Sequence, residues 1–275
     1  MKRIAGLFQN MGDGMKNTFL GVLLVAAPAA AQAQSTCASY VGTTVAPLTF
    51  DQAVGSIKPV APKGEFETSD AYQARLASSG GSGPLIISKK IEGAQYLAYN
   101  ADAGAFEVKS YLFDNTNFSA WDTFYYAKVT SPKASTMGNL DVTISSSEVE
   151  TGTYSAQNGF GAKTTVTKIT RTEKAIFEGE PARYNDNLFI SDKDAVVGRV
   201  PMSVAEAQAF KPQAKIAIVA VPKLPYVVRA TYPYGDTTIS NPTDVTVNAT
   251  VLVADIQCGL LMNGTNQVVA AFPTR

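Results

Sequence analysis

From residue 84 onward, apolar and polar residues alternate with a period of two, in short segments rich in β-branched and aromatic side chains. Gly, Asn, Asp or Pro separates one segment from the next, as is typical of turns between strands. Because strands that follow each other so closely pair most readily as hairpins, we expect mainly antiparallel sheet. The predicted strands are residues 85–87, 95–99, 106–113, 123–129, 140–145, 162–170, 175–178, 214–221, 226–232, 244–254, 256–262 and 267–272.

Two segments carry helix signals instead. Thr68 or Ser69 can cap a helix over about residues 68–77, which a Gly/Ser-rich run then ends. Ser203 and Glu206 form a capping box, which predicts a second short helix over about residues 203–209. The expected fold class is therefore α+β, with one or two mainly antiparallel β-sheets and two short helices.

The first 33 residues have the three-part layout of a secretory signal peptide. Lys2 and Arg3 supply the basic start, residues 19–31 form an apolar run, and Ala31-Gln32-Ala33 offers small side chains for cleavage after Ala33. Met15 is an alternative start. A retained membrane anchor is the competing interpretation, but the run is shorter than the roughly 20 residues that cross a bilayer as a helix. We expect a periplasmic or secreted protein with no membrane span after signal removal.

Beyond this leader, residues 34–83 form a lead-in segment that ends with the first helix, and residues 84–275 form a β-rich globular body. The part before the first helix has one short apolar piece at 45–50 and otherwise no clear period. We therefore expect no regular element there.

Cys37 and Cys258 are the only cysteines. Export would place them where disulfides persist, so we expect them to pair; the alternative is two unpaired thiols. The chain from residue 34 carries 20 of the 23 basic and 22 of the 23 acidic residues. This near-neutral balance argues against a nucleic-acid partner, which would demand a basic face.

Histidine is absent from the chain. Its absence excludes Ser-His-Asp and Cys-His nucleophiles and His-ligated zinc. Because the chain also lacks a recognisable nucleophile motif and the spacing of a known calcium loop, we expect no catalytic residue, no metal site and no cofactor. Carboxylate, Ser-Lys and oxygen-ligand chemistry remain open. The candidates for these are Glu65 and Glu67 as an acid and base, Asp186, Asp192 and Asp194 with Asn185 and Asn187 as calcium ligands, and Ser88-Lys89, Ser131-Pro132-Lys133 and Thr165 with Lys168 as nucleophile pairs. Helix capping, a solvated turn and surface lysines explain these residues better.

Aromatic residues are dense between residues 111 and 126, where Tyr111, Phe113 and Phe118 precede the only tryptophan. Rings beside amides suit contacts with proteins and sugars, because they bury apolar area and still offer hydrogen bonds. Most of the group should be core. The candidate binding residues are Trp121, Phe124, Tyr125 and Tyr126, and the expected partner is an unknown envelope protein or glycan.

Two short motifs lie far apart in the chain. The first is GEFET at residues 64–68, followed by Tyr72 and Arg75, and the second is QNGFG at residues 157–161. On these motifs the chain, from about residue 60 to 275, resembles uncharacterised exported bacterial proteins, and the resemblance implies no known activity. Physically, Glu65 and Glu67 suit a helix N-terminus, and Asn158-Gly159 suits a tight turn whose Phe160 we expect to tuck into the core.

Taken together, these features predict an exported, non-catalytic interaction or structural protein. The alternative is a carboxylate-dependent hydrolase that acts on envelope glycans. That alternative requires two facing carboxylates, at least one of them buried enough for a raised pKa.

Overall fold

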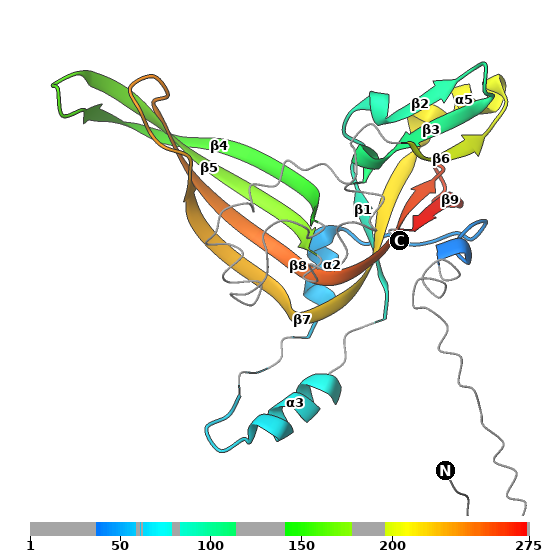
Figure 1. The fold of residues 1–275 in the computed structure, drawn as a ribbon, viewed down its shortest axis with the longest axis horizontal. Helices are drawn as coiled ribbons and strands as arrows, with labels where there is room; N and C mark the ends of the chain where they lie inside the picture. Colours follow the sequence, from blue (N-terminus) through cyan, green and yellow to red (C-terminus); the bar gives the residue numbers. More distant parts are fainter. Residues whose placement is uncertain are drawn as a thin grey trace, which may run out of the picture.

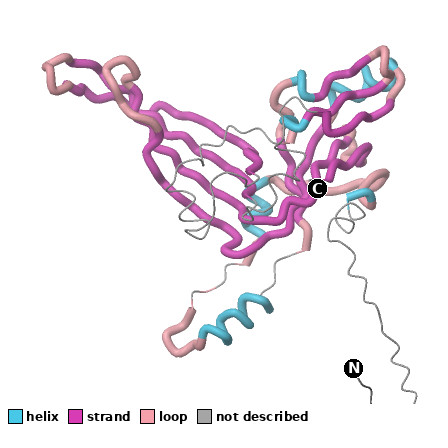
Figure 2. Tube along the Cα trace, in the orientation of Figure 1, coloured by secondary structure: helices cyan, strands magenta, loops and turns pink. Residues whose placement is uncertain are grey.

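Two β-sheets and several short helices make up the part of the chain that the structure describes. The computed structural model describes residues 37–58, 61, 63–78, 83–113, 141–177 and 196–273. Figures 1 and 2 show a large curved sheet on one side and a smaller layer of strands and a helix on the other. The predicted α+β class is confirmed.

The large sheet has six strands in the order β1-β7-β8-β5-β4, with β9 also paired to β8. Strand β7 pairs with nearly the whole length of β8, so β5 and β9 share the other edge of β8, one at each end. All pairs are antiparallel except β5 with β8, which is parallel and joins strands far apart in the chain. The bounds are β1 Leu85–Lys89, β4 Asp141–Gln157, β5 Lys163–Phe177, β7 Lys215–Tyr234, β8 Thr243–Met262 and β9 Val268–Pro273.

Three of these strands each merge two segments that the sequence pattern predicts as separate strands, and β4 extends well beyond the predicted strand 140–145. The predicted strands 214–221 and 226–232 are parts of the single strand β7, the predicted strands 244–254 and 256–262 are parts of β8, and the two predicted strands that cover residues 163–170 and 175–177 are parts of β5. In β7 the register with β8 shifts between Pro222 and Val227, and Tyr226 there has a φ of 66°. Such an irregularity bends a strand while its pairing with the neighbouring strand continues on both sides. In β7 the break in the period-two pattern therefore marks a bend and not the end of a strand.

The smaller sheet is antiparallel, with the order β2-β3-β6. Its strands are β2 Leu97–Asn100, β3 Ala105–Lys109 and β6 Val196–Pro201. The predicted strands 95–99 and 106–113 are thus partly helical, because the 3-10 turns η1 Ala94–Tyr96 and η2 Ser110–Leu112 flank β2 and β3. Helix α5, Val204–Phe210, begins at Ser203, where the predicted capping box with Glu206 is present. A third 3-10 turn, η4 Lys211–Gln213, follows it.

One apolar core joins the two sheets. Phe106 of β3 packs against Phe210 of α5, with ring centroids 5.5 Å apart, and the same buried cluster includes Ile218 and Leu252 of the large sheet. A second cluster occupies the opposite face of the sheet around Phe177 of β5. The alternation of the strands produces this division, because successive side chains point to opposite faces.

The segment before the first predicted helix contains an element that the sequence analysis missed. Helix α2, Phe50–Ser56, has a capping box between Thr49 and Gln52, and it buries Phe50 and Ala53 in the main core. Its Asp51 pairs with Lys174 of β5 at 2.6 Å. The Thr-x-x-Gln spacing was visible in the sequence, but a helix of seven residues is too short to show an apolar period.

Cys37 and Cys258 form a disulfide with Cα atoms 6.1 Å apart, as the sequence analysis predicted. Both residues are buried in a third apolar cluster with Val219, Leu260 and Val268. Backbone bonds from Gly42 and Val45 to the β8–β9 turn region hold the same segment against the sheet. In the described part of the chain, no helix has the length and apolar character to cross a membrane.

Candidate functional site

Two long hairpins project together from one end of the large sheet. One joins β4 to β5 and the other joins β7 to β8. In Figures 1 and 2 their turns lie side by side at the end farthest from the smaller sheet. The ladder between β5 and β8 begins at Thr167 and Thr243, so residues 163–166 pair with β4 alone. We call the hairpin ends, residues 148–171 and 231–248, the arm.

Side-chain contacts brace the arm on both faces. On one face, Arg171 of β5 bonds Glu148 of β4 at 2.7 Å and lies 4.5 Å from the ring of Tyr234 on β7. On the other face, the Tyr154 hydroxyl of β4 bonds Asp244 of β8 at 3.4 Å. Partial burial raises the pKa of Tyr154, and the nearby negative charge of Asp244 raises it further. These contacts link both hairpins, so the arm is one unit.

The QNGFG motif forms the tip of the arm. The Asn158 side-chain oxygen accepts hydrogen bonds from the backbone N–H groups of Phe160 and Ala162, at 3.0 and 2.9 Å. Gly161 has a φ of 87°, a conformation that glycine adopts without strain. The turn is therefore held by its own hydrogen bonds and does not depend on packing.

Phe160 is 99% exposed at this tip. The expectation that its ring tucks into the core is wrong. The reason is tertiary: beyond Thr167 the hairpin is a two-stranded ribbon, and no second layer in the described structure covers its turn. Glycines on both sides of Phe160 were the available signal, since they leave the ring without neighbouring side chains.

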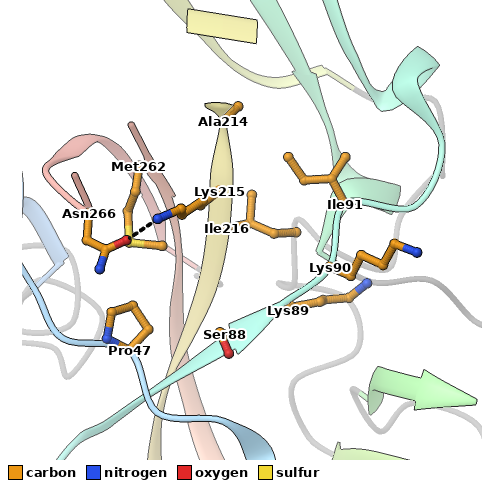
Figure 3. Close-up of a pocket in the computed structure, with 10 residues that line it drawn as sticks. All are labelled: Pro47, Ser88, Lys89, Lys90, Ile91, Ala214, Lys215, Ile216, Met262 and Asn266. Atoms are coloured by element: carbon orange, nitrogen blue, oxygen red, sulfur yellow. Dashed lines mark hydrogen bonds between the residues drawn. The ribbon is translucent and has the colours of Figure 1, made fainter. Parts of the chain in front are cut away.

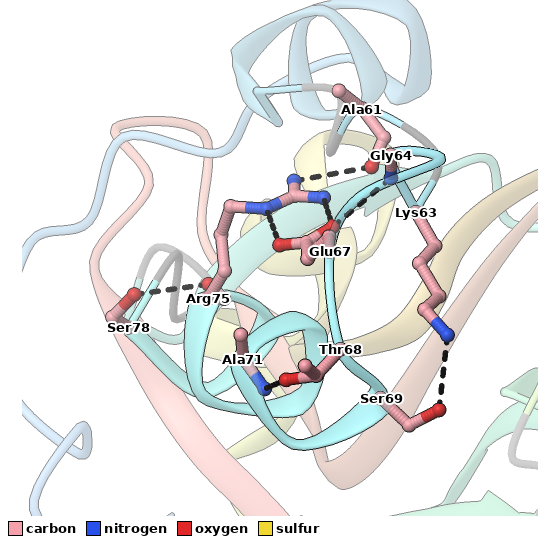
Figure 4. A network of polar contacts seen from close by, with 9 residues as sticks. All are labelled: Ala61, Lys63, Gly64, Glu67, Thr68, Ser69, Ala71, Arg75 and Ser78. Atoms are coloured by element: carbon pink, nitrogen blue, oxygen red, sulfur yellow. Dashed lines mark hydrogen bonds and ion pairs between the residues drawn. The ribbon is translucent and has the colours of Figure 1, made fainter.

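The GEFET motif also forms an internally bonded turn, which precedes α3, Ser69–Ser78 (Figure 4). Glu67 accepts from the Arg75 guanidinium through both carboxylate oxygens at 2.8 Å and from the Gly64 N–H at 3.1 Å. The hydrogen bonds from Arg75 are the main cause that lowers the Glu67 pKa to about 2. Glu67 is thus an ionised structural anchor, which is unsuited to the acid–base role weighed above.

The same turn exposes its phenylalanine. Thr68 caps α3 by accepting the Ala71 N–H at 3.2 Å, and Arg75 lies 5.0 Å from the ring centre of Tyr72. Phe66, within the turn, is 95% exposed. Each of the two motifs therefore makes a self-bonded turn that exposes a phenylalanine ring.

A hollow of about 460 Å³ lies where β1 and β7 meet the β8–β9 turn (Figure 3). Its described lining includes three lysines, Lys89, Lys90 and Lys215, and no carboxylate. Lys215 donates to Gly264 O and Asn266 Oδ1, at 2.8 and 2.9 Å. Figure 3 shows Lys89 and Lys90 pointing to the other side, so the three charges do not converge.

The nucleophile candidate in this hollow has a structural contact. Ser88 Oγ donates to Leu48 O at 3.0 Å, which ties β1 to the N-terminal segment. Ser88 and Lys89 are consecutive in a strand, so their side chains leave opposite faces. The Ser88-Lys89 pair therefore lacks the geometry of Ser-Lys catalysis.

A second hollow, also about 460 Å³, lies beside α5 and is mainly apolar. Its lining residues are Tyr99, Ala101, Val204, Ala207, Gln208, Lys211 and Pro212. Ala207 is buried, whereas Val204 is 51% exposed. The Tyr99 hydroxyl donates to Met202 O at 2.7 Å, so the tyrosine presents its ring to the hollow with its polar atom bonded. We call this the α5 hollow.

The one fully buried carboxylate among the described residues lies beside an arginine. Glu173 is 1% exposed and lies 3.8 Å from the Arg171 guanidinium, which also holds Glu148. The hydrogen bond from Arg75 lowers the pKa of Glu67 and the hydrogen bond from Ser203 lowers that of Glu206, so neither of these two carboxylates has the raised pKa of a general acid. The described residues also contain no group of three or more acidic or cysteine side chains placed to hold a metal.

Most of the aromatic candidates lie outside the described residues. This applies to Trp121, Phe124, Tyr125 and Tyr126, and also to Phe118 and to the calcium candidates Asp186, Asp192 and Asp194. Of the same aromatic group, Phe113 is fully buried against Phe272, with ring centroids 5.4 Å apart, and Tyr111 packs against Tyr96 at 4.6 Å. These two rings therefore contribute to packing within the globular body.

Comparison of the chain with protein-family models, with curated proteins and with solved structures returned no match in any of the three. The features that bear on function are therefore the arm, the two exposed phenylalanines and the hollows.

Proposed function

We propose that this chain is an exported, non-catalytic interaction protein whose contact element is the arm, with Phe160 as its anchor. The observation that carries the proposal is the 99% exposure of Phe160 on a turn that its own hydrogen bonds hold. The braces between the two hairpins support the same reading, because they hold the tip at a constant orientation relative to the sheet.

The physical advantage lies in preorganisation. Burying a phenylalanine side chain is worth roughly 1.5–3 kcal/mol, so an exposed ring can contribute that free energy when a partner covers it. On a flexible loop much of it would be lost to ordering the loop on binding. The Asn158 bonds to Phe160 and Ala162 order the tip in advance, so a partner would retain most of the gain.

Export is part of the proposal. The disulfide between Cys37 and Cys258 supports an oxidising compartment, where such bonds persist. The leader-like residues 1–33 support the same compartment, and the partner is then a component of the envelope or of the medium. Intact-mass measurement of the protein recovered from a bacterial periplasm tests this: we expect a chain beginning at Gln34, and a mass that retains residues 19–31 would contradict it.

Site-specific photo-crosslinking in cells tests the contact element. A photoreactive phenylalanine analogue at position 160 should give a discrete crosslinked product upon illumination. The same analogue at Thr165, which is exposed on the same ribbon, is the matched control and should give none. No product at position 160, or equal products at both positions, would refute the assignment of the tip. Phe160→Ala should leave the thermal midpoint unchanged, which shows that the fold is intact.

A further inference from the structure

The molecule carries an exposed phenylalanine, Phe160, which we call the knob, at one end and the apolar α5 hollow, or recess, at the other. Figure 1 shows the β4–β5 and β7–β8 turns at one extreme of the long axis, and β2, β3 and α5 near the other extreme. Phe160 belongs to the β4–β5 turn. The α5 hollow is lined from Tyr99 and Ala101 on the small sheet side and from Val204, Ala207 and Pro212 on the helix side.

The recess suits an aromatic ring in size and lining. The hollow is open to solvent, and its volume of about 460 Å³ lies within the roughly 300–1,000 Å³ typical of ligand pockets, which is more than one phenyl ring occupies. Buried Ala207 adds little bulk to its wall, and Val204 presents an exposed apolar side chain to solvent at its edge. A ring that enters would cover both Val204 and the ring of Tyr99.

The polar groups of the two surfaces also complement each other. Lys211 lines the recess, and an ammonium group is attracted to the negative face of an aromatic ring. Residues 157–162 of the tip carry no charged side chain, so the tip enters without stripping water from a charge. Gln208 and the amides of Gln157 and Asn158 can then hydrogen-bond at the rim.

We propose that the arm tip of one copy inserts Phe160 into the α5 hollow of a second copy. This inference rests on the proposed function of the tip as the contact element, and it names the partner. The separation in Figure 1 prevents a copy from filling its own hollow. The contact is head-to-tail, with different surfaces on the two copies, so repetition gives open chains, or rings where the rotation closes. A single turn in a recess buries less than the roughly 1,200 Å² of a stable interface, so assembly depends strongly on concentration.

Sedimentation velocity of the protein exported from the full gene, over increasing concentration, tests the proposal. The wild type should form species beyond the dimer. Phe160→Ala removes the knob and Val204→Glu places a charge in the recess, and each should weaken self-association roughly tenfold or more. Val204→Glu should fold normally, because a carboxylate in the first turn of α5 is favoured by the helix dipole. Phe66→Ala removes an equally exposed ring elsewhere and should assemble like the wild type.

Mixing provides the decisive result. Phe160→Ala retains the recess and Val204→Glu retains the knob, so an equimolar mixture should form dimers and nothing larger. A wild type that stays monomeric at every concentration, single variants that assemble like the wild type, or a mixture that gives no dimer would each overturn the proposal.

The mass of the product crosslinked at position 160 separates this inference from the broader one. A product containing two copies of this chain supports self-assembly. A product with a different molecule leaves the contact role of the tip in place and refutes self-assembly, and the absence of any product refutes both.

Discussion

Removing the disulfide should lower the stability of the whole chain by several kcal/mol. The perturbation is Cys37→Ala combined with Cys258→Ala, which leaves no unpaired thiol. The two cysteines are 221 residues apart in sequence, so the bond closes a loop that includes nearly every described element. It therefore restricts almost the entire unfolded chain.

The loop-entropy relation gives the magnitude. A loop of this length corresponds to a loss of unfolded-state freedom worth about 5 kcal/mol at 25 °C. Residual structure in the unfolded chain reduces that value, so we expect a decrease of roughly 3–5 kcal/mol in the free energy of unfolding. Alanine is the replacement of choice because both sites lie in an apolar cluster with Val219 and Leu260, where a serine hydroxyl would add its own desolvation cost.

Urea unfolding followed by circular dichroism measures this effect in three samples: the oxidised wild type, the wild type with reductant, and the double variant. Reduction and substitution should lower the midpoint similarly, because both remove the same constraint. Hydrogen exchange shows whether the loss is global. An unchanged midpoint, or a loss of protection confined to residues 37–45, would refute the reasoning. Either result would mean that the disulfide does not restrict the whole unfolded chain and that the backbone bonds from Gly42 and Val45 suffice to hold the N-terminal segment.

Three further predictions follow from local geometry. Gly259→Ala should destabilise the protein by about 1–3 kcal/mol in thermal or urea unfolding, because a Cβ there would clash with two ring carbons of buried Phe113. Gly159→Ala is the control, because a Cβ at that position meets nothing within 4 Å. Glu67→Gln should loosen the turn before α3 at neutral pH, as seen by amide exchange of residues 64–72. Because folding lowers the Glu67 pKa from 4.5 to about 2, the wild-type turn should keep full stability above pH 4.5 and lose it as the pH falls through about 2; a turn that is unchanged at pH 2 would contradict the anchor role. Ser203→Ala should cost about 1 kcal/mol in unfolding experiments, because it removes the cap of α5, and a loss that Ser203→Asp fails to restore would argue against capping.

The sequence by itself determined the features that depend on near neighbours. Period-two alternation located β1, β9 and the segments that make up β5, β7 and β8, but it did not predict β6 or residues 146–157 of β4. The Ser203–Glu206 spacing located α5 to within one residue. Thr68 marked the start of α3 in the same way. In each case the signal is a contact between residues a few positions apart, which the order of residues specifies. The cysteine pair was also inferable, because only one pairing exists in this chain.

Only the tertiary structure decided which segments join and which rings are covered. Residues 214–221 and 226–232 became one bent strand because β8 runs beside both, and the parallel ladder of β5 with β8 brings Thr167 next to Thr243. Phe113 and Phe160 are the same residue type, yet one is fully buried and the other 99% exposed. The α5 hollow likewise combines Tyr99 with Val204. Burial depends on what the rest of the chain places opposite a side chain, and those contacts are non-local, so no local pattern specifies them.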